Sequence, residues 1–244
     1  MEKKYKLTDE TINLGAKILH RIKAIRNFGE VKKGDKGGFI ESEDNLSHEG
    51  NCWIYDEAKV YNNAKVFNNA IVRDYAVVGD CAEISHNALV MDRTKIYGTA
   101  KICDNSIIKD WACITNNAVI SAYSIIKDNC CIYDEAKIKF GYIGGYVRIG
   151  GNTIVFNGTL IIGVCTFIGD AIISDINDYI IFKNWWSSGR YFVWTRSNNM
   201  WSVGCFYGTG KELIEKAYKD SELSGKEYER VVKYVESIID NNKL

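Results

Sequence analysis

The sequence contains no proline among its 244 residues. Proline lacks the backbone N–H that a strand donates to its neighbour, so its absence is compatible with long, uninterrupted β ladders. A charge excess of either sign is also missing, because 31 basic residues balance 31 acidic ones. This balance argues against a broad electrostatic surface for nucleic acid or for an anionic membrane.

Long apolar runs are missing as well, and no export signal is expected. No apolar stretch approaches the roughly 18–20 residues that cross a bilayer. The opening residues, MEKKYK, are not followed by the apolar core of a signal peptide. We therefore expect a cytoplasmic protein without membrane association. In that setting the eight cysteines are expected to be reduced, small apolar side chains and not a disulfide framework.

The dominant feature of the chain is a six-residue repeat. An aliphatic side chain recurs every six residues from Ile54 to Ile138, and a small side chain precedes each one by two positions. Two residues with this spacing point to the same side of a short strand. Asn, Asp and Gly fill many of the following positions and tolerate the left-handed backbone of a tight corner. Three such units make one triangular coil of about 18 residues.

A second run of repeats, from Ile149 to Ile173, follows a glycine-rich stretch at 140–146. The step from Ile138 to Ile149 is eleven residues, one short of two repeats. We expect a one-residue deletion or bulge there within a continuous solenoid. The fold class is therefore mainly β, with a left-handed parallel β-helix of about 6–7 triangular coils over residues 40–175.

These hexads resemble the hexapeptide-repeat, LpxA-like superfamily of left-handed β-helices, many of whose members are trimeric acyltransferases. The N-terminal side more closely resembles the YdcK-like group, which is described as acyltransferases. The motifs that carry this resemblance are NFGEVKKG at 27–34, GGFI at 37–40, NLS at 45–47 and GNCWIYDE at 50–57. The resemblance covers roughly residues 4–140, and similar openings occur in phage and prophage proteins.

Residues 1–39 are expected to form an N-terminal β cap. Strands are predicted around Tyr5–Thr8 and Ile18–Ile25. A solenoid needs such a cap because its terminal coil otherwise leaves an open edge and a bare core.

Residues 176–244 are expected to form a small C-terminal α+β domain of three strands followed by two helices. The predicted strands are Tyr179–Trp186, Arg190–Thr195 and Met200–Phe206. A capping box predicts the start of each helix, TGKE at 209–212 for the first and SGKE at 224–227 for the second. This tail resembles one that recurs on phage and prophage solenoid proteins.

A catalytic base for acyl transfer would have to be one of three histidines, His20, His48 or His86. His86 alone lies within the repeat, at a corner beside Asn87, where a solvated turn residue is the simpler interpretation. Cys113 and Cys131 should stack on adjacent coils, but no histidine shares their column to complete a metal site. We therefore expect no catalytic residue, metal or cofactor, and keep His86 with acetyl-CoA as the alternative.

Stacking positions 18 residues apart predicts an apolar stripe on one face of the solenoid. Its members are Ile71, Leu89, Ile107 and Ile125, continued by Ile143. The corresponding columns on the other two faces mix lysine, glutamate, valine and cysteine. A continuous apolar stripe is expected to be covered, either by another subunit or by the C-terminal domain folding back. We favour a homo-oligomer, with a trimer first and a dimer second.

The C-terminal region is rich in aromatic residues interleaved with arginine. Most of these aromatics are expected in a core, but tryptophan, tyrosine and arginine also dominate interface hot spots and stack on nucleotide bases. The predicted binding residues are Trp185, Trp186, Arg190, Arg196 and Trp201.

The leading hypothesis is a non-catalytic, oligomeric binding protein with a protein partner. The resemblance to phage proteins suggests a host defence component or its signalling molecule as that partner. An acyl-CoA-dependent acyltransferase is the alternative, and a structural virion part is a third possibility.

Overall fold

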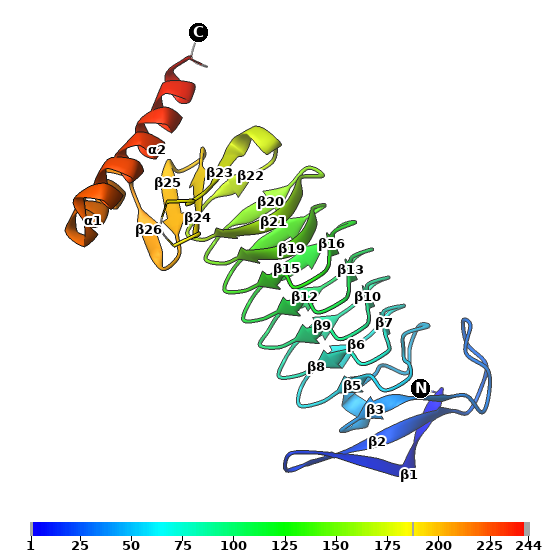
Figure 1. Cartoon of the computed structure of the whole chain (residues 1–244). Coiled ribbons are helices and arrows are strands. Elements are labelled where there is room, and N and C mark those ends of the chain that lie inside the picture. The colour runs from blue at the N-terminus through cyan, green and yellow to red at the C-terminus, as the bar shows by residue number, and fades with distance from the viewer. Residues whose placement is uncertain (1, 187, 242–244) are drawn as a thin grey trace.

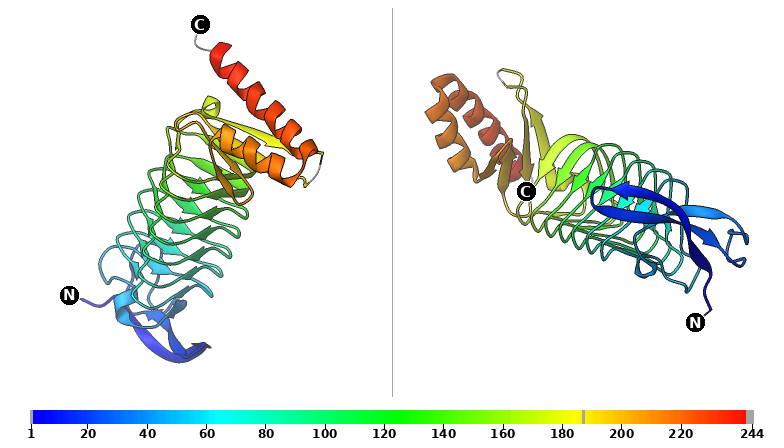
Figure 2. Two further views of the ribbon diagram at one scale, coloured as in Figure 1. Left: turned by 90° about the vertical axis from the view of Figure 1, so that its left-hand side faces the viewer. Right: turned by 90° about the horizontal axis from the view of Figure 1, so that it is seen from below.

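The computed structural model describes residues 2–186 and 188–241 and shows a parallel β-solenoid with a cap at each end (Figure 1). An antiparallel hairpin lies at the N-terminal end, and a small sheet with two helices lies at the other. Both turned views in Figure 2 keep this order along the long axis. The predicted parallel β-helix with a small C-terminal α+β unit is confirmed. No helix in the described part of the chain combines the length and apolarity needed to cross a membrane.

Three columns of short parallel strands form the solenoid walls. The first column contains β3 (Lys36–Ile40), β5 (Lys59–Val60), β8 (Val77–Val78), β11 (Lys95–Ile96), β14 (Cys113–Ile114), β17 (Cys131–Ile132) and parts of β19 (Tyr142–Ile149) and β21 (Leu160–Phe167). The second contains β4 (Trp53–Ile54), β7 (Ile71–Val72), β10 (Leu89–Val90), β13 (Ile107–Ile108), β16 (Ile125–Ile126) and the first residues of β19 and β21. The third contains β6 (Lys65–Val66), β9 (Glu83–Ile84), β12 (Lys101–Ile102), β15 (Val119–Ser121), β18 (Lys137–Lys139), β20 (Ile154–Phe156) and β22 (Ile172–Ile173).

The solenoid makes about eight turns, more than the predicted 6–7. The difference arises at the N-terminal end, where Phe39 and Ile40 pair in parallel with Lys59 and Val60. The strand that contains them also pairs antiparallel with the hairpin. One strand therefore belongs both to the cap and to the first turn of the solenoid, across the predicted boundary at residue 39.

The repeat fills the core as the sequence predicts, because its aliphatic positions, such as Ile108 and Ile114, are fully buried. The corner residues adopt positive φ, for example 58° at Asp92 and 62° at Asp110. One set of corners forms an aspartate ladder, in which each carboxylate accepts a hydrogen bond from the backbone N–H of the corresponding corner one turn later. The five N–H···Oδ2 distances lie between 2.8 and 3.2 Å, and the ladder consists of Asp56, Asp74, Asp92, Asp110 and Asp128.

The predicted one-residue deletion is confirmed. Ile107 pairs with Ile125, 18 positions later, whereas Ile125 pairs with Tyr142, only 17 positions later. The shortened corner contains Gly141, where an added Cβ would lie 2.8 Å from the Ile138 side chain. The shift also corrects one prediction, because Tyr142 continues the outward column while Ile143 is fully buried in the core.

The N-terminal cap is built from β1 (Tyr5–Leu14) and β2 (Lys17–Ala24), which pair antiparallel. The first strand is longer than predicted, whereas the second matches the prediction to within one residue at each end. Lys4, just before β1, is fully buried. Its ammonium donates to the carbonyls of Glu49, Gly50 and Cys52 at 3.3, 3.2 and 2.8 Å. Burial lowers the pKa of Lys4. The cap thus supplies donors to backbone carbonyls at the open end of the solenoid. A 3₁₀ turn, η1 (Glu43–Asn45), precedes the second coil.

The C-terminal unit has four antiparallel strands and two helices. The predicted third strand is divided, because Gly204 at φ 59° forms a tight turn within it. The first capping box is confirmed at Thr209, but the second helix begins at Glu222, so the predicted box at Ser224 lies inside the helix. The elements are η2 (Ile176–Asp178), β23 (Tyr179–Lys183), β24 (Tyr191–Thr195), β25 (Met200–Val203), β26 (Phe206–Gly208), α1 (Gly210–Asp220) and α2 (Glu222–Asn241).

This sheet lies between the solenoid and the helices. Val193 belongs to the solenoid core, and Ile181 packs against that core. Trp194, the neighbour of Val193, packs instead with Leu213 and Val232 of the helices. Alternate side chains of one strand point to opposite faces, which explains this division. The unit therefore covers the end of the solenoid and does not fold back over its side (Figure 1).

Candidate functional site

A pocket of about 330 Å³ lies at the junction between the last coils and the C-terminal sheet. We call it the junction pocket. The solenoid supplies Arg148 to its lining, and the C-terminal unit supplies Arg190, directly before β24. Of the described residues that line it, none is Asp, Glu or His. The full lining is Tyr146, Arg148, Val164, Cys165, Thr166, Arg190, Tyr191, Ser202 and Gly204.

Hydroxyl groups and aromatic rings complete this lining. Thr166 and Ser202 offer hydroxyls, while Tyr146 and Tyr191 offer rings. The Arg148 guanidinium also lies over the ring of Tyr133, 5.6 Å from its centroid. A volume in the range of ligand pockets, with convergent donors beside apolar surface, is suited to binding a small anionic group.

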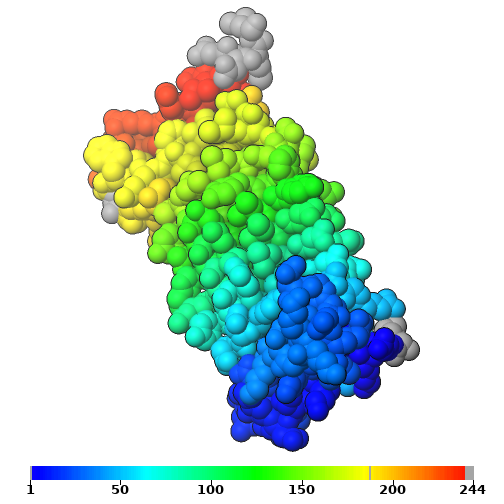
Figure 3. Space-filling model, turned by 90° about the vertical axis from the view of Figure 1, so that its right-hand side faces the viewer, coloured from blue at the N-terminus to red at the C-terminus, as the bar shows by residue number. Residues whose placement is uncertain are grey.

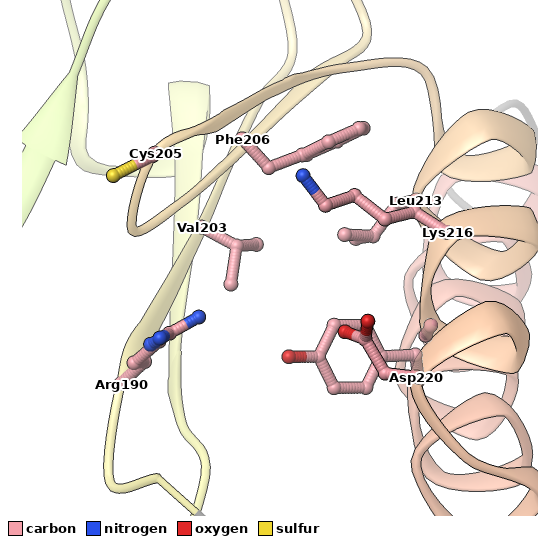
Figure 4. Close-up of a pocket in the computed structure, with 9 residues that line it drawn as sticks. Arg190, Val203, Cys205, Phe206, Leu213, Lys216 and Asp220 are labelled. Carbon is pink, nitrogen blue, oxygen red and sulfur yellow. The ribbon is translucent and has the colours of Figure 1, made fainter.

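A second, smaller pocket of about 60 Å³ lies on the helix side of the same sheet. Figure 4 shows Arg190 facing Asp220 of α1 across this space, with Lys216 beside Phe206 and the Cys205 sulfur directed away. Such a volume holds a few water molecules. Arg190 lines both pockets and therefore connects the junction pocket to the helices.

The structure divides the predicted binding residues. Trp185 is 83% exposed, and Trp186 is half-buried against Phe192, with ring centroids 5.9 Å apart. Trp201 is only 2% exposed and packs in the core between sheet and helices. The prediction of Trp201 as a ligand contact is corrected. Side chains along β25 alternate between the two faces of the sheet, and that of Trp201 lies on the face toward the helices.

Arg196 is exposed and its Nε donates to the Asn177 carbonyl at 3.0 Å, which fastens the turn before β23. Of the five predicted residues, Arg190 lines the junction pocket. Sequence reasoning missed Arg148 and Tyr146. The sequence held one indication of them, because the corner residues of the hexad repeat are missing in this part of the chain. There β19 and β21 each continue through one corner of the solenoid as a single strand.

The four predicted stripe residues Ile71, Leu89, Ile107 and Ile125 stack in register along the second column. Each is half-buried. The column continues through Tyr142 to Leu160, which is 54% exposed. We call the four isoleucine and leucine residues the apolar stripe. Figure 3 shows one long side of the molecule, with the cap and the C-terminal unit at its two ends and open solenoid surface between them.

An exposed ridge follows the corner after the apolar stripe. The Arg93 guanidinium lies between two rings, 5.5 Å from Tyr75 and 4.8 Å from Trp111. Both rings are more than half exposed. Sequence reasoning missed this ridge, although its members are spaced by 18 residues and so share one column. Tyrosine, arginine and tryptophan are the residue types that dominate interface hot spots.

His86 is exposed at a corner with φ 57°, as expected of a turn residue. The structure adds two neighbours that the sequence reasoning did not connect with it. Cys103 and Asp104 bring their side chains to the same corner, and the ligand atoms of all three lie within 4.8 Å of one another. The 18-residue spacing of His86 and Asp104 was the signal for this cluster.

All eight cysteines are free. Cys113 and Cys131 pair in register as predicted, and Arg148 continues their column. A hydrogen bond from Cys113, together with the nearby Arg148 charge, lowers the pKa of Cys131 to about 7, while the same bond raises the pKa of Cys113.

No family model matches the chain. A segment of 43 residues is 46% identical to the "Uncharacterized acetyltransferase YdcK" of Escherichia coli strain K12. The segment is 18% of this chain and spans only 13% of that protein's length. Together with the β-solenoid, the match supports a resemblance to hexapeptide-repeat proteins of this kind.

Proposed function

We propose that the protein is a non-catalytic, oligomeric binding protein that holds an anionic group in the junction pocket. The observation that carries this proposal is that Arg148 and Arg190 both line a cavity of about 330 Å³. Arginine binds carboxylates and phosphates through two parallel N–H···O bonds. No histidine or carboxylate is among the described lining residues, so the pocket offers binding groups without the commonest general bases.

The two walls of this pocket come from different parts of the chain. Besides the pocket itself, Asn198 and Tyr207 of the C-terminal unit contact Asp170 of the solenoid at 2.9 and 3.2 Å. A ligand that engages both arginines would therefore also hold the C-terminal unit on the solenoid. Ligand binding is expected to raise the melting temperature of the whole chain.

Arg148→Gln and Arg190→Gln test this binding function. The probes are a mononucleotide and a short acidic peptide, which separate phosphate from carboxylate recognition, and binding is measured by calorimetry and by thermal shift. We expect one probe to bind, and either variant to weaken it at least about tenfold. Lys211→Gln is the matched control, because this lysine is 86% exposed and lies outside the pocket. Equal binding by wild type and both arginine variants would reject the junction pocket as the site.

Self-association is the second part of the proposal, with a trimer favoured over a dimer. It is supported by the apolar stripe, whose side chains are only half-buried within the single chain, and by the adjacent ridge at Arg93. Ile107→Glu places a charge in the middle of the stripe, and an unpaired charge is costly to bury in an interface. We expect this variant to be monomeric by light scattering, whereas wild type is oligomeric.

Val119→Glu is the matched control for Ile107→Glu. Val119 occupies the equivalent outward position on the third face, between Lys101 and Lys137. The same substitution there is expected to leave the oligomer intact. A monomeric wild type would reject self-association and leave the stripe as a feature of the single chain.

A protein is the partner class that we propose for the assembled molecule. The exposed Tyr75–Arg93–Trp111 ridge and the exposed Trp185 side chain support this. The resemblance of the chain to phage proteins makes a host protein the first candidate. Trp185→Ala and Trp111→Ala should each reduce capture of that partner without changing the oligomer.

Acyl transfer is the second candidate function. The match to a protein named an acetyltransferase favours it, and His86 is the histidine that the repeat offers as a base. Tight acetyl-CoA binding and its turnover, both abolished by His86→Asn, would overturn the non-catalytic proposal.

A further inference from the structure

His86, Cys103 and Asp104 form a cluster on the solenoid corner that leads into the apolar stripe. The imidazole, thiol and carboxylate ligand atoms all lie within 4.8 Å of one another. We propose that these three side chains bind a divalent transition-metal ion, with Zn²⁺ as the best fit. The expectation of a protein without a metal is revised by this proposal, which stands apart from the junction pocket and from self-association.

The ligand types select the metal. Zinc is bound in proteins by cysteine, histidine and aspartate, whereas calcium and magnesium require oxygen ligands. Zinc–ligand bonds of about 2.0–2.3 Å place tetrahedral ligands about 3.3–3.8 Å apart. Side-chain torsions therefore need to close the observed cluster by about 1.5 Å at most. The Cys103 thiol would lose its proton to solvent as the metal binds.

The fold places the three residues on adjacent turns of one corner. His86 and Asp104 occupy equivalent corner positions on adjacent turns, with φ 57° and 58°. Equivalent positions on adjacent coils are about 4.8 Å apart. Cys103, directly before Asp104, is half-buried, and its thiol donates to the Ile120 carbonyl at 3.6 Å.

Hydrogen bonds orient two of the ligands. The Ser85 hydroxyl lies 3.1 Å from His86 Nδ1, on the same corner. The backbone N–H of Ala122, one turn further on, donates to Asp104 Oδ2 at 2.8 Å, so one carboxylate oxygen is held and the other remains for a metal. Partners of this kind fix ligand orientation in metal sites.

The cluster is confined to one pair of turns. The corner positions before and after it are occupied by Asn68 and Ala122, which would not complete a zinc site with the same geometry. Three protein ligands leave the fourth tetrahedral position for water, which is the arrangement of zinc sites that act on a substrate. The site is thus able to bind a further ligand at the edge of the apolar stripe.

The repeat itself supplies variants that preserve the fold. Asn68 occupies the same corner position as His86 and Asp104, so His86→Asn and Asp104→Asn insert a residue that this corner already accepts. Ser85 and Ser121 occupy the position of Cys103 on the turns below and above, so Cys103→Ser is equally mild. A loss of metal binding in these variants therefore reports on ligands and not on misfolding, which circular dichroism checks.

Cobalt(II) and zinc titrations of the full chain, with any affinity tag removed, test the proposal. We expect one Co²⁺ per chain with a thiolate-to-cobalt charge-transfer band, displaced by Zn²⁺. Each of the three variants should weaken binding by about 100-fold or more, since even changes to the partners of metal ligands cost about 10–100-fold. Cys81→Ser, which removes an exposed cysteine elsewhere on the solenoid, is the control and should bind normally.

Alkylation followed by mass spectrometry gives an independent readout. Zn²⁺ should protect Cys103 and leave Cys81 reactive. The absence of a thiolate band, binding that persists in Cys103→Ser, or equal protection of Cys81 and Cys103 would each overturn the metal site.

Discussion

The aspartate ladder gives a prediction in which geometry and charge oppose each other. Asp110 lies in its middle, holds φ at 62° and accepts a hydrogen bond from the Asp128 backbone N–H at 3.0 Å. Its neighbours, Asp92 and Asp128, carry the same charge one turn away. Substitutions at this one position distinguish the contributions of the backbone conformation, the hydrogen bond and the charge repulsion to the free energy of unfolding.

The magnitudes follow from these contacts. A left-handed conformation costs an alanine about 1–2 kcal/mol, and the lost hydrogen bond costs about 1 kcal/mol. Asp110→Ala should therefore reduce the free energy of unfolding by about 2–3 kcal/mol. Asp110→Gly avoids the first cost but loses the bond and about 0.5–1 kcal/mol of backbone entropy, for a total of about 1.5–2 kcal/mol.

Asparagine keeps both the left-handed conformation and an acceptor oxygen. Like alanine and glycine, it removes the repulsion, which is about 0.9 kcal/mol per neighbour in water at a spacing of about 4.8 Å. This relief reduces the costs of the alanine and glycine variants by the same amount and leaves the order of the three variants unchanged. Lys127, 3.7 Å from Asp128, offsets part of that repulsion. We expect Asp110→Asn to equal or exceed the stability of wild type at low salt, with the gain shrinking as salt is added.

Urea unfolding followed by far-ultraviolet circular dichroism measures all three variants. The expected order of stability is Asn, then Gly, then Ala. An alanine variant as stable as the glycine variant would refute the conformational argument. An asparagine variant as unstable as the alanine variant would show that the charge, and not the corner geometry, stabilises the ladder.

Three further predictions concern other parts of the chain. Ile114→Ala should cost about 2–5 kcal/mol in urea unfolding because its side chain is fully buried; a cost below 1 kcal/mol would contradict the packed core. Trp201→Ala should cost about 3–5 kcal/mol, whereas Trp185→Ala, at an 83% exposed site, should stay within about 0.5 kcal/mol; equal effects would contradict their placement. Alkylation of Cys131 should rise with pH through a midpoint of about 7, because the thiolate is the reactive form. Cys113→Ala should move that midpoint upward, and an unchanged midpoint would contradict the hydrogen bond between the two thiols.

The repeat made the solenoid predictable from the sequence. Each hexad specifies its own strand and corner through residues at most six positions apart, and the 18-residue turn then places equivalent positions in columns. The deletion before Tyr142 and the stacking of Cys113 on Cys131 follow from counting alone. The apolar stripe was predicted for the same reason, apart from its continuation at Ile143, where the shortened turn shifts the column by one residue.

The candidate sites were less accessible to sequence reasoning. The junction pocket joins Arg148 to Arg190, and no periodicity relates a coil to a strand of the C-terminal sheet. Trp201 could not be assigned to the core until β25 was placed between the solenoid and the helices. The cluster of His86 with Cys103 and Asp104 was implicit in the 18-residue spacing, but only side-chain positions show that the three groups meet.

The sequence alone therefore determined the solenoid, its interruption and its one apolar face, because those features rest on local geometry repeated along the chain. Tertiary structure alone decided how the ends close. The burial of Lys4 under the first turn, the end-on packing of the C-terminal sheet and the resulting pocket all depend on contacts between distant residues. Such contacts leave no periodic pattern in the sequence, because each is made only once. Each depends on the side chains at one end of the solenoid.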